Sequence, residues 1–112
     1  MTIFEKIARH EIPAKIVEEN DDFIAFHDAN PQAPVHVLIV PKRVITRIGE
    51  ATDSDATLLG RLLVASRDIA RKLGVFDSGY RLVINHGPDA GESVPHLHVH
   101  LLAGRGLGWP PG

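Results

Sequence analysis

The sequence predicts a single α+β domain with a mainly antiparallel sheet. Five short segments have the apolar pattern of strands, and one long and one short segment have apolar residues at helical spacing. The chain has 112 residues, of which 44% are hydrophobic and 23% are charged. This length and composition suffice for one buried core but not for two domains, so we expect one domain over residues 1–112.

The N-terminal half predicts a short helix and then three strands. Apolar residues at helical spacing predict a helix over residues 2–9, with Thr2 as its N-cap. A polar turn separates the strands expected over residues 15–19 and 23–27, which favours an antiparallel hairpin. A loop with two prolines follows, and the continuous apolar run over residues 35–40 predicts a buried strand.

The C-terminal half predicts the long helix and the last two strands. We expect the helix to begin at Asp53 or Ser54 and to end at Leu73, because Thr52 and Asp55 have the spacing of a capping box. Strands are expected over residues 80–85 and 96–102. The helical stripe expected to face the sheet comprises Leu59, Leu62, Leu63, Ala70 and Leu73.

Charge and composition argue against several classes of function. The formal net charge is −2, and the sequence has no run of five or six like charges, so neither a nucleic-acid arm nor a membrane-binding patch is expected. The absence of cysteine removes disulfides, thiolate metal sites and a cysteine nucleophile. Apolar runs of signal-peptide or membrane-spanning length are also absent. We therefore expect a cytoplasmic protein that binds neither nucleic acids nor membranes.

Three of the seven histidines alternate with apolar residues near the C-terminus. His96, His98 and His100 would project from one face of a strand, at a spacing of about 7 Å between neighbours. The intervening apolar residues would point the other way, toward the core beneath the long helix. The sequence therefore predicts a row of imidazoles on one face of the sheet.

Such a row has three uses. The histidines can be solvated or hydrogen-bonded without any chemistry, or two of them can bind zinc with a third ligand from a neighbouring strand. Glu92 and Asp89 are the nearest acidic residues for such a site, and both lie in a glycine-rich loop. Neutral imidazole is also a competent nucleophile toward phosphorus, with a pKa suited to proton transfer. We favour this third use without a metal, with His98 as the nucleophile.

Other features extend this hypothesis. The loop over residues 85–94 exposes backbone N–H groups that can bind an anion, with Ser93 as a hydroxyl donor. Asp28 can accept hydrogen bonds from two sugar hydroxyls or form an Asx-turn, and His36 is either a fourth site residue or an ordinary core histidine. The tail over residues 104–112 contains Trp109, whose burial should make the tail dock on its own domain or on a second subunit.

Several separate motifs in the same order resemble the histidine-triad (HIT) family, in its Hint branch. The segment His96–Leu102 is similar to the triad signature. In this signature three histidines alternate with apolar residues, and two apolar residues follow the last histidine. The resemblance also covers Ile3–Ile7, Glu11–Ile16, Ala25–Asp28, Pro31–Pro34, His36–Lys42, Gly91–Val94 and Trp109–Gly112. It extends over nearly the whole chain.

The resemblance implies a HIT fold, and a homodimer whose two five-stranded sheets join into a ten-stranded sheet. It also implies a nucleotide-binding hydrolase of the adenosine 5'-monophosphoramidase type. Such an enzyme cleaves the P–N bond of purine nucleoside phosphoramidates, and aminoacyl-adenylates, through a nucleotidyl-histidine and without a cofactor. Its nucleotides would be AMP and GMP. Alternatives are a dinucleoside polyphosphate hydrolase, a nucleotidyl transferase, or a nucleotide-sensing interaction protein with vestigial activity.

The resemblance also implies roles for individual residues. His98 matches the nucleophile, His100 the residue that binds the α-phosphate, His96 the support of the nucleophile, and His36 the residue that tunes protonation. Ser93 matches the serine near the scissile bond. The implied nucleotide-binding residues are Asp28 for the ribose, then Ala29, Asn85, Gly91, Glu92, Ser93, Val94, His98 and His100, with Phe4, Ile7, Ile12, Phe23 and Ile24 for the base and Trp109 reaching the partner's site.

Glu92 departs from the family pattern, because many relatives have glutamine at this position. A carboxylate beside a phosphate would repel it unless the carboxylate faces away or is protonated. The contact of Glu92 with the nucleotide is therefore the weakest of the implied roles.

Overall fold

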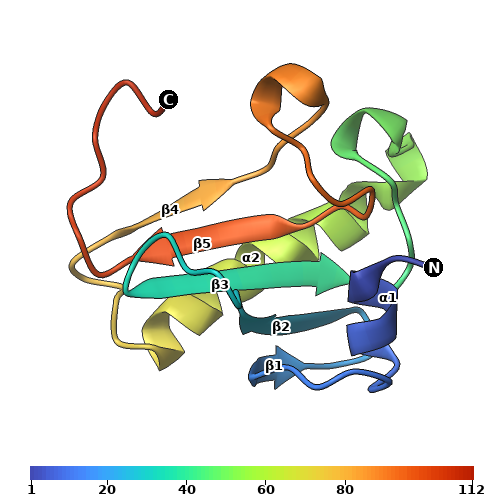
Figure 1. The fold of residues 1–112 in the computed structure, drawn as a ribbon, viewed down its shortest axis with the longest axis horizontal. Coiled ribbons are helices and arrows are strands. Elements are labelled where there is room, and N and C mark those ends of the chain that lie inside the picture. The colour runs from blue at the N-terminus through green and yellow to red at the C-terminus, as the bar shows by residue number, and fades with distance from the viewer.

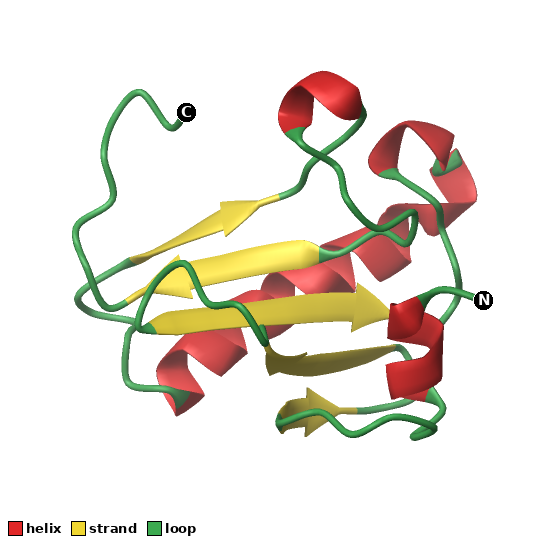
Figure 2. Ribbon diagram, in the orientation of Figure 1, coloured by secondary structure: helices red, strands yellow, loops and turns green.

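The computed structural model describes residues 1–112, which form one five-stranded antiparallel sheet with the order β1-β2-β3-β5-β4 (Figure 1). The long helix lies along one face of this sheet, as Figure 2 shows by secondary structure. The elements are α1 (Ile3–Ala8), β1 (Ile16–Glu19), β2 (Phe23–His27), β3 (Val35–Pro41), α2 (Ala56–Lys72), β4 (Tyr80–Val83) and β5 (Val99–Ala103), with short 3-10 helices η1 (Ile48–Glu50), η2 (Asp53–Asp55) and η3 (Pro88–Ala90). The predicted α+β class is confirmed.

Both predicted helix starts are confirmed by their caps. The Thr2 hydroxyl accepts a hydrogen bond from the Glu5 backbone N–H (3.1 Å), and the Glu5 carboxylate accepts one from the Thr2 N–H (3.1 Å). Thr52 and Asp55 form the second capping box. The long helix begins there as the 3-10 turn η2 and continues as α2, so its first turn is tighter than expected.

The larger core lies between α2 and the sheet. Strand residues of alternating positions, among them Val37, Val99 and Leu101, pack there against the buried face of α2. Leu62 lies on that face, but Leu63 is 46% exposed, which corrects the expected stripe. The buried positions of α2 follow an i, i+3, i+4, i+7, i+8 series that starts at Leu62, and Leu63 lies outside this series. The buried residues of α2 are Leu62, Ala65, Ser66, Ile69 and Ala70.

A smaller apolar cluster covers part of the opposite face of the sheet. It comprises Phe4 and Ile7 of α1 with Ile24, Phe26, Leu38 and Val40 of the sheet. The short helix α1 therefore packs on the face that α2 leaves free. No helix in the structure has the length and apolar character needed to cross a membrane.

Strand β5 is shorter than predicted. Its pairing with β3 runs from Ile39 opposite Val99 to Val35 opposite Ala103, so His96 and His98 precede the strand. The Leu97 N–H donates to the Ile45 carbonyl (2.6 Å) rather than to a strand partner. Strand β4 also ends early, at Val83.

The C-terminal tail does not fold back onto the core. Trp109 is 84% exposed, so the expected docking of this residue on its own domain is wrong. The Arg81 guanidinium holds the tail by donating to the Gly108 carbonyl (2.9 Å). The other expectation, docking on a second subunit, remains a prediction.

Candidate active site

Four imidazoles meet on the face of the sheet that carries α1. His36 comes from β3 and His100 from β5, while His96 and His98 lie just before β5. The intervening Leu97, Val99 and Leu101 belong to the α2 core. The alternation therefore places all three triad rings on one face, as predicted. The rings lean together more than expected, because the His98 and His100 centroids are only 4.9 Å apart.

The hydrogen bonds of His98 leave one ring nitrogen free. The His96 carbonyl lies 2.7 Å from His98 Nδ1, and a carbonyl can only accept, so Nδ1 carries the proton. In the neutral ring, Nε2 then keeps its lone pair. Burial lowers the pKa of His98, although its contact with the His96 carbonyl opposes the shift. At neutral pH this ring is therefore oriented and uncharged, with a free lone pair on Nε2.

The tautomer of His100 follows from its neighbours. The Gln32 backbone N–H donates to His36 Nδ1 (3.0 Å), so neutral His36 carries its proton on Nε2. His36 Nε2–H then donates to His100 Nδ1 (2.9 Å), which leaves the His100 proton on Nε2. His100 therefore offers an N–H donor beside the His98 ring. Burial and then the adjacent His98 and His36 lower the pKa of His100 to about 4, and burial also lowers the pKa of His36.

His96 is fully buried, and its ring has a structural role. Its Nε2–H donates to the Pro41 carbonyl (2.8 Å), so Nδ1 accepts from the Thr2 hydroxyl (3.1 Å). This ring joins the end of β3 to the start of α1. It supports His98 through its backbone carbonyl rather than through its ring. No local sequence pattern indicates these two partners, which are 94 and 55 residues away from His96.

The carboxylate of Glu92 is bound to Arg47, a residue that the sequence analysis missed. Arg47 Nε lies 2.9 Å from Oε1 and Nη2 lies 3.0 Å from Oε2, and the Gly87 N–H also donates to Oε1 (3.2 Å). The Arg47 guanidinium and then the Gly87 N–H hold the pKa of Glu92 down, at about 2. Glu92 is therefore ionised, and its charge is balanced by Arg47. Within the same loop, Ser93 is exposed and Asn85 is half-buried.

A cavity of about 670 Å³ lies between α1 and the loop after β2. It brings together four of the predicted nucleotide-binding residues, Ile7, Ile12, Asp28 and Ala29, and the predicted catalytic residue His36. Phe26, Ile3 and Lys15, which were not predicted, also line it. Phe4 lies next to the histidines instead, with its ring centroid 4.9 Å from that of His98.

Besides Phe4, two residues predicted for the base cleft do not reach this cavity. Phe23 packs in the core beneath α2, on the opposite face of the sheet from the histidines. Ile24 has the correct face but is fully buried beneath α1. Adjacent strand residues point to opposite faces, so Phe23 and Ile24 could not both line one cleft. Both assignments are therefore corrected.

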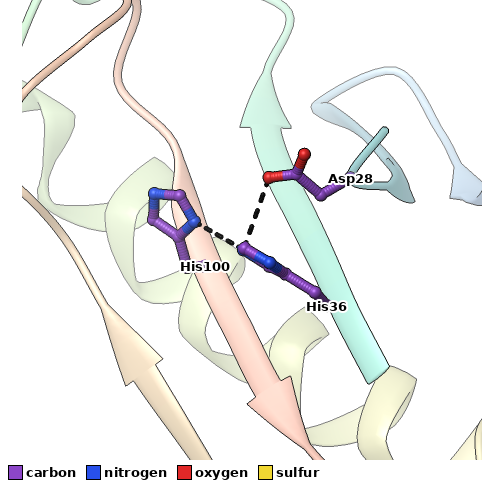
Figure 3. Close-up of side chains that lie close together, drawn as sticks. All are labelled: Asp28, His36 and His100. Atoms are coloured by element: carbon purple, nitrogen blue, oxygen red, sulfur yellow. Dashed lines mark hydrogen bonds and ion pairs between the residues drawn. The ribbon is translucent and has the colours of Figure 1, made fainter. Parts of the chain in front are cut away.

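Asp28 uses both of its carboxylate oxygens. Oδ1 accepts from the Asn30 backbone N–H (2.8 Å), which is an Asx-turn. Oδ2 lies 3.4 Å from His36 Nε2, and Figure 3 shows the carboxylate turned toward that ring. The Asx-turn thus fixes a carboxylate acceptor at the wall of the cavity. One geometry is therefore compatible with both interpretations of Asp28, as an Asx-turn residue and as an acceptor for sugar hydroxyls.

Asp28, His36 and His100 also form a group that could hold a metal, because their ligand atoms lie within 4.8 Å of one another (Figure 3). A zinc-bound histidine normally donates its second N–H to an acceptor. His36 does the opposite, since its Nδ1 accepts the Gln32 N–H and its Nε2 must keep the proton. The hydrogen bonds of these residues therefore do not fit a zinc site.

Comparisons with known proteins agree with this fold. Residues 9–107 match the family model for the HIT domain. An uncharacterised HIT-like protein from Synechocystis is 53% identical over 111 residues, which covers 99% of this chain and 96% of the relative. A 14 kDa zinc-binding protein from Zea mays is 48% identical over 113 residues, which covers 99% of this chain and 88% of the relative.

Two solved structures are similar throughout. A HIT family hydrolase from Legionella pneumophila superimposes with a TM-score of 0.97 at 45% identity, over 100% of both chains. A histidine triad nucleotide-binding protein from Candida albicans has a TM-score of 0.82 at 31% identity, over 98% of this chain and 83% of the other. The chain therefore belongs to the HIT family.

Proposed function

We propose that this HIT protein belongs to the Hint branch. It hydrolyses the P–N bond of purine nucleoside phosphoramidates, and the acyl phosphate P–O bond of aminoacyl-adenylates, in both cases at the α-phosphorus. The observation that carries the proposal is the tautomer of His98. Its Nδ1–H is held by the His96 carbonyl, and its Nε2 lone pair is free beside the His100 ring. A neutral, oriented imidazole next to an N–H donor suits nucleophilic attack on a phosphorus whose oxygens must be held.

The proposed reaction has two steps. His98 Nε2 forms a bond to the α-phosphorus while the P–N bond of the substrate breaks, and the departing amine takes a proton from solvent. The modified His98 ring is then cationic, and its Nδ1–H still donates to the His96 carbonyl. Water next attacks phosphorus, which releases the nucleoside monophosphate and a proton and restores neutral His98. Throughout, His100 Nε2–H donates to a non-bridging oxygen.

The cavity beside the histidines suits the nucleoside. Ile7, Ile12 and Phe26 give it an apolar wall, and Asp28 gives it an acceptor for ribose hydroxyls. Burial of a base against apolar side chains, with a few polar groups to orient the sugar, is the usual composition of such sites. The same arrangement would place the α-phosphate toward His98, His100 and the loop residues Asn85, Gly91, Ser93 and Val94.

We also propose a homodimer. Strand β4 is at the edge of the sheet, where its free backbone groups can pair with a second copy. Trp109 is 84% exposed and would be buried if the tail reached that copy. Sedimentation velocity should give a mass of two chains, and a monomer at micromolar concentration would contradict the proposal.

Substrate preference tests the proposed activity. AMP linked through nitrogen to lysine or tryptamine should be cleaved to AMP and the free amine. Diadenosine polyphosphates should be cleaved far more slowly by the same preparation. The opposite preference would indicate a dinucleoside polyphosphate hydrolase. Tight AMP binding without turnover of either substrate would indicate a nucleotide-sensing protein.

A further inference from the structure

Polar contacts connect two segments beside the histidine row: residues 45–49 and the loop that contains His86 and Glu92. Arg47 lies two residues after Ile45, whose carbonyl accepts the Leu97 N–H (2.6 Å). One end of this segment is therefore anchored to the triad. Arg47 then binds both oxygens of Glu92 (2.9 and 3.0 Å). The Gly49 N–H adds a third link by donating to His86 Nδ1 (3.1 Å).

The loop that receives these contacts has little apolar burial of its own. Its residues 88–91 are all exposed, so packing holds the loop only at its end, where Val94 lies against the smaller apolar cluster. It closes on itself through Glu92, whose N–H donates to the Gly87 carbonyl (3.2 Å) and whose carboxylate accepts the Gly87 N–H (3.2 Å). The same carboxylate is the group that Arg47 binds. The position of the loop relative to the triad therefore depends strongly on the guanidinium.

The contact with Arg47 is geometrically strong for a surface pair. The Arg47 side chain is 28% exposed and that of Glu92 is 13% exposed, and the two groups meet through two parallel hydrogen bonds. Arg47 Nη1 also donates to Glu50 (3.1 Å), so all three guanidinium nitrogens are engaged. Because the pKa of Glu92 is held at about 2, the pair stays ionised at every pH at which the enzyme is assayed.

From these contacts we propose that Arg47 is a positioning residue for catalysis, acting through Glu92. It fixes the loop over residues 87–93, and with it Ser93 and the backbone N–H groups, against the phosphate bound at His98 and His100. It also balances the Glu92 charge, which would otherwise repel that phosphate. This inference rests on the proposed function, since it needs a phosphate at the triad.

A double-mutant cycle tests this role. Arg47→Gln should lower kcat for an AMP–lysine phosphoramidate by about ten- to a hundredfold, because misplaced positioning groups have effects of this size. KM should change much less, since the nucleoside cavity is untouched. Glu92→Gln should also lower kcat, and the double variant should be no slower than Arg47→Gln, because both changes remove the same contact. Arg47→Lys should restore part of the loss.

Two further measurements separate positioning from general instability. Hydrogen exchange in Arg47→Gln should rise in residues 87–93 and stay unchanged in β3 and β5. Arg61→Gln is the matched control, since it removes another ion pair (Arg61 with Asp22, 3.1 Å), between α2 and the turn before β2. It should leave kcat unchanged.

A wild-type kcat in Arg47→Gln would overturn the inference, and so would additive losses in the double variant or exchange that rises throughout the sheet. Failure of the proposed function would differ, because the wild-type protein itself would then not cleave the phosphoramidate.

Discussion

Removing the Thr2 hydroxyl should destabilise the protein through two contacts at once. The hydroxyl caps α1 by accepting the Glu5 N–H (3.1 Å), and it donates to Nδ1 of fully buried His96 (3.1 Å). Loss of a capping side chain costs about 1 kcal/mol. A buried acceptor left without its donor costs a further 1–3 kcal/mol, roughly. For Thr2→Val, which keeps the shape of the side chain, we therefore expect a loss of about 3 kcal/mol in the free energy of unfolding.

Chemical and thermal unfolding measure this loss. For a domain of this length the expected decrease in Tm is about 10 °C, at roughly 4 °C per kcal/mol. Thr2→Ser is the control, because it keeps the hydroxyl and should lose only a fraction of that stability. Activity per folded molecule should persist in both variants, since His98 is held by the His96 backbone carbonyl and not by its ring. Equal stability of the valine and serine variants would refute the role given to His96.

Two further predictions follow from the site. Burial lowers the pKa values of His36, His98 and His100 below those in the unfolded chain, so the unfolded state binds more protons as the pH falls. The free energy of unfolding should therefore be constant above about pH 6.5 and decline toward pH 4, and His100→Asn should reduce that slope in urea titrations. A flat profile in the wild-type protein would contradict the burial of neutral rings. Phe23→Ala should cost about 3–5 kcal/mol of stability without weakening AMP binding by the folded protein, because the ring lies beneath α2. Ile12→Ala should weaken AMP binding and cost little stability. Calorimetric AMP titration and unfolding of both variants can check these expectations.

Features with a local period could be predicted from the sequence. The caps at Thr2 and Thr52 depend on residues three positions away, and the single-faced triad depends on the two-residue repeat of an extended chain. The two errors in packing broke the same rules. Leu63 lies outside the i, i+3, i+4 series of the buried α2 positions, and Phe23 could not share a strand face with Ile24. Strict use of the period would have avoided both.

Contacts between distant segments could not be predicted in this way. Arg47 and Glu92 are 45 residues apart, and only the folded sheet brings their loops together. A glutamate where many relatives have glutamine is expected to face away or to be protonated, and nothing in the sequence indicates that Arg47 balances its charge. The tautomers of the histidines could not be predicted either. They are set by backbone groups, which side-chain patterns do not reveal: the Gln32 N–H, the Pro41 carbonyl and the His96 carbonyl.

Direct detection of the covalent intermediate tests the nucleophile. The protein should be quenched in acid-free conditions within milliseconds of mixing with an AMP phosphoramidate, digested, and examined by mass spectrometry. We expect one adenylyl group on His98 and none in His98→Ala. The kcat of this variant should fall by several orders of magnitude, while its AMP affinity and Tm stay close to wild type. An adduct on another residue, or multiple turnovers by His98→Ala at the wild-type rate, would contradict it.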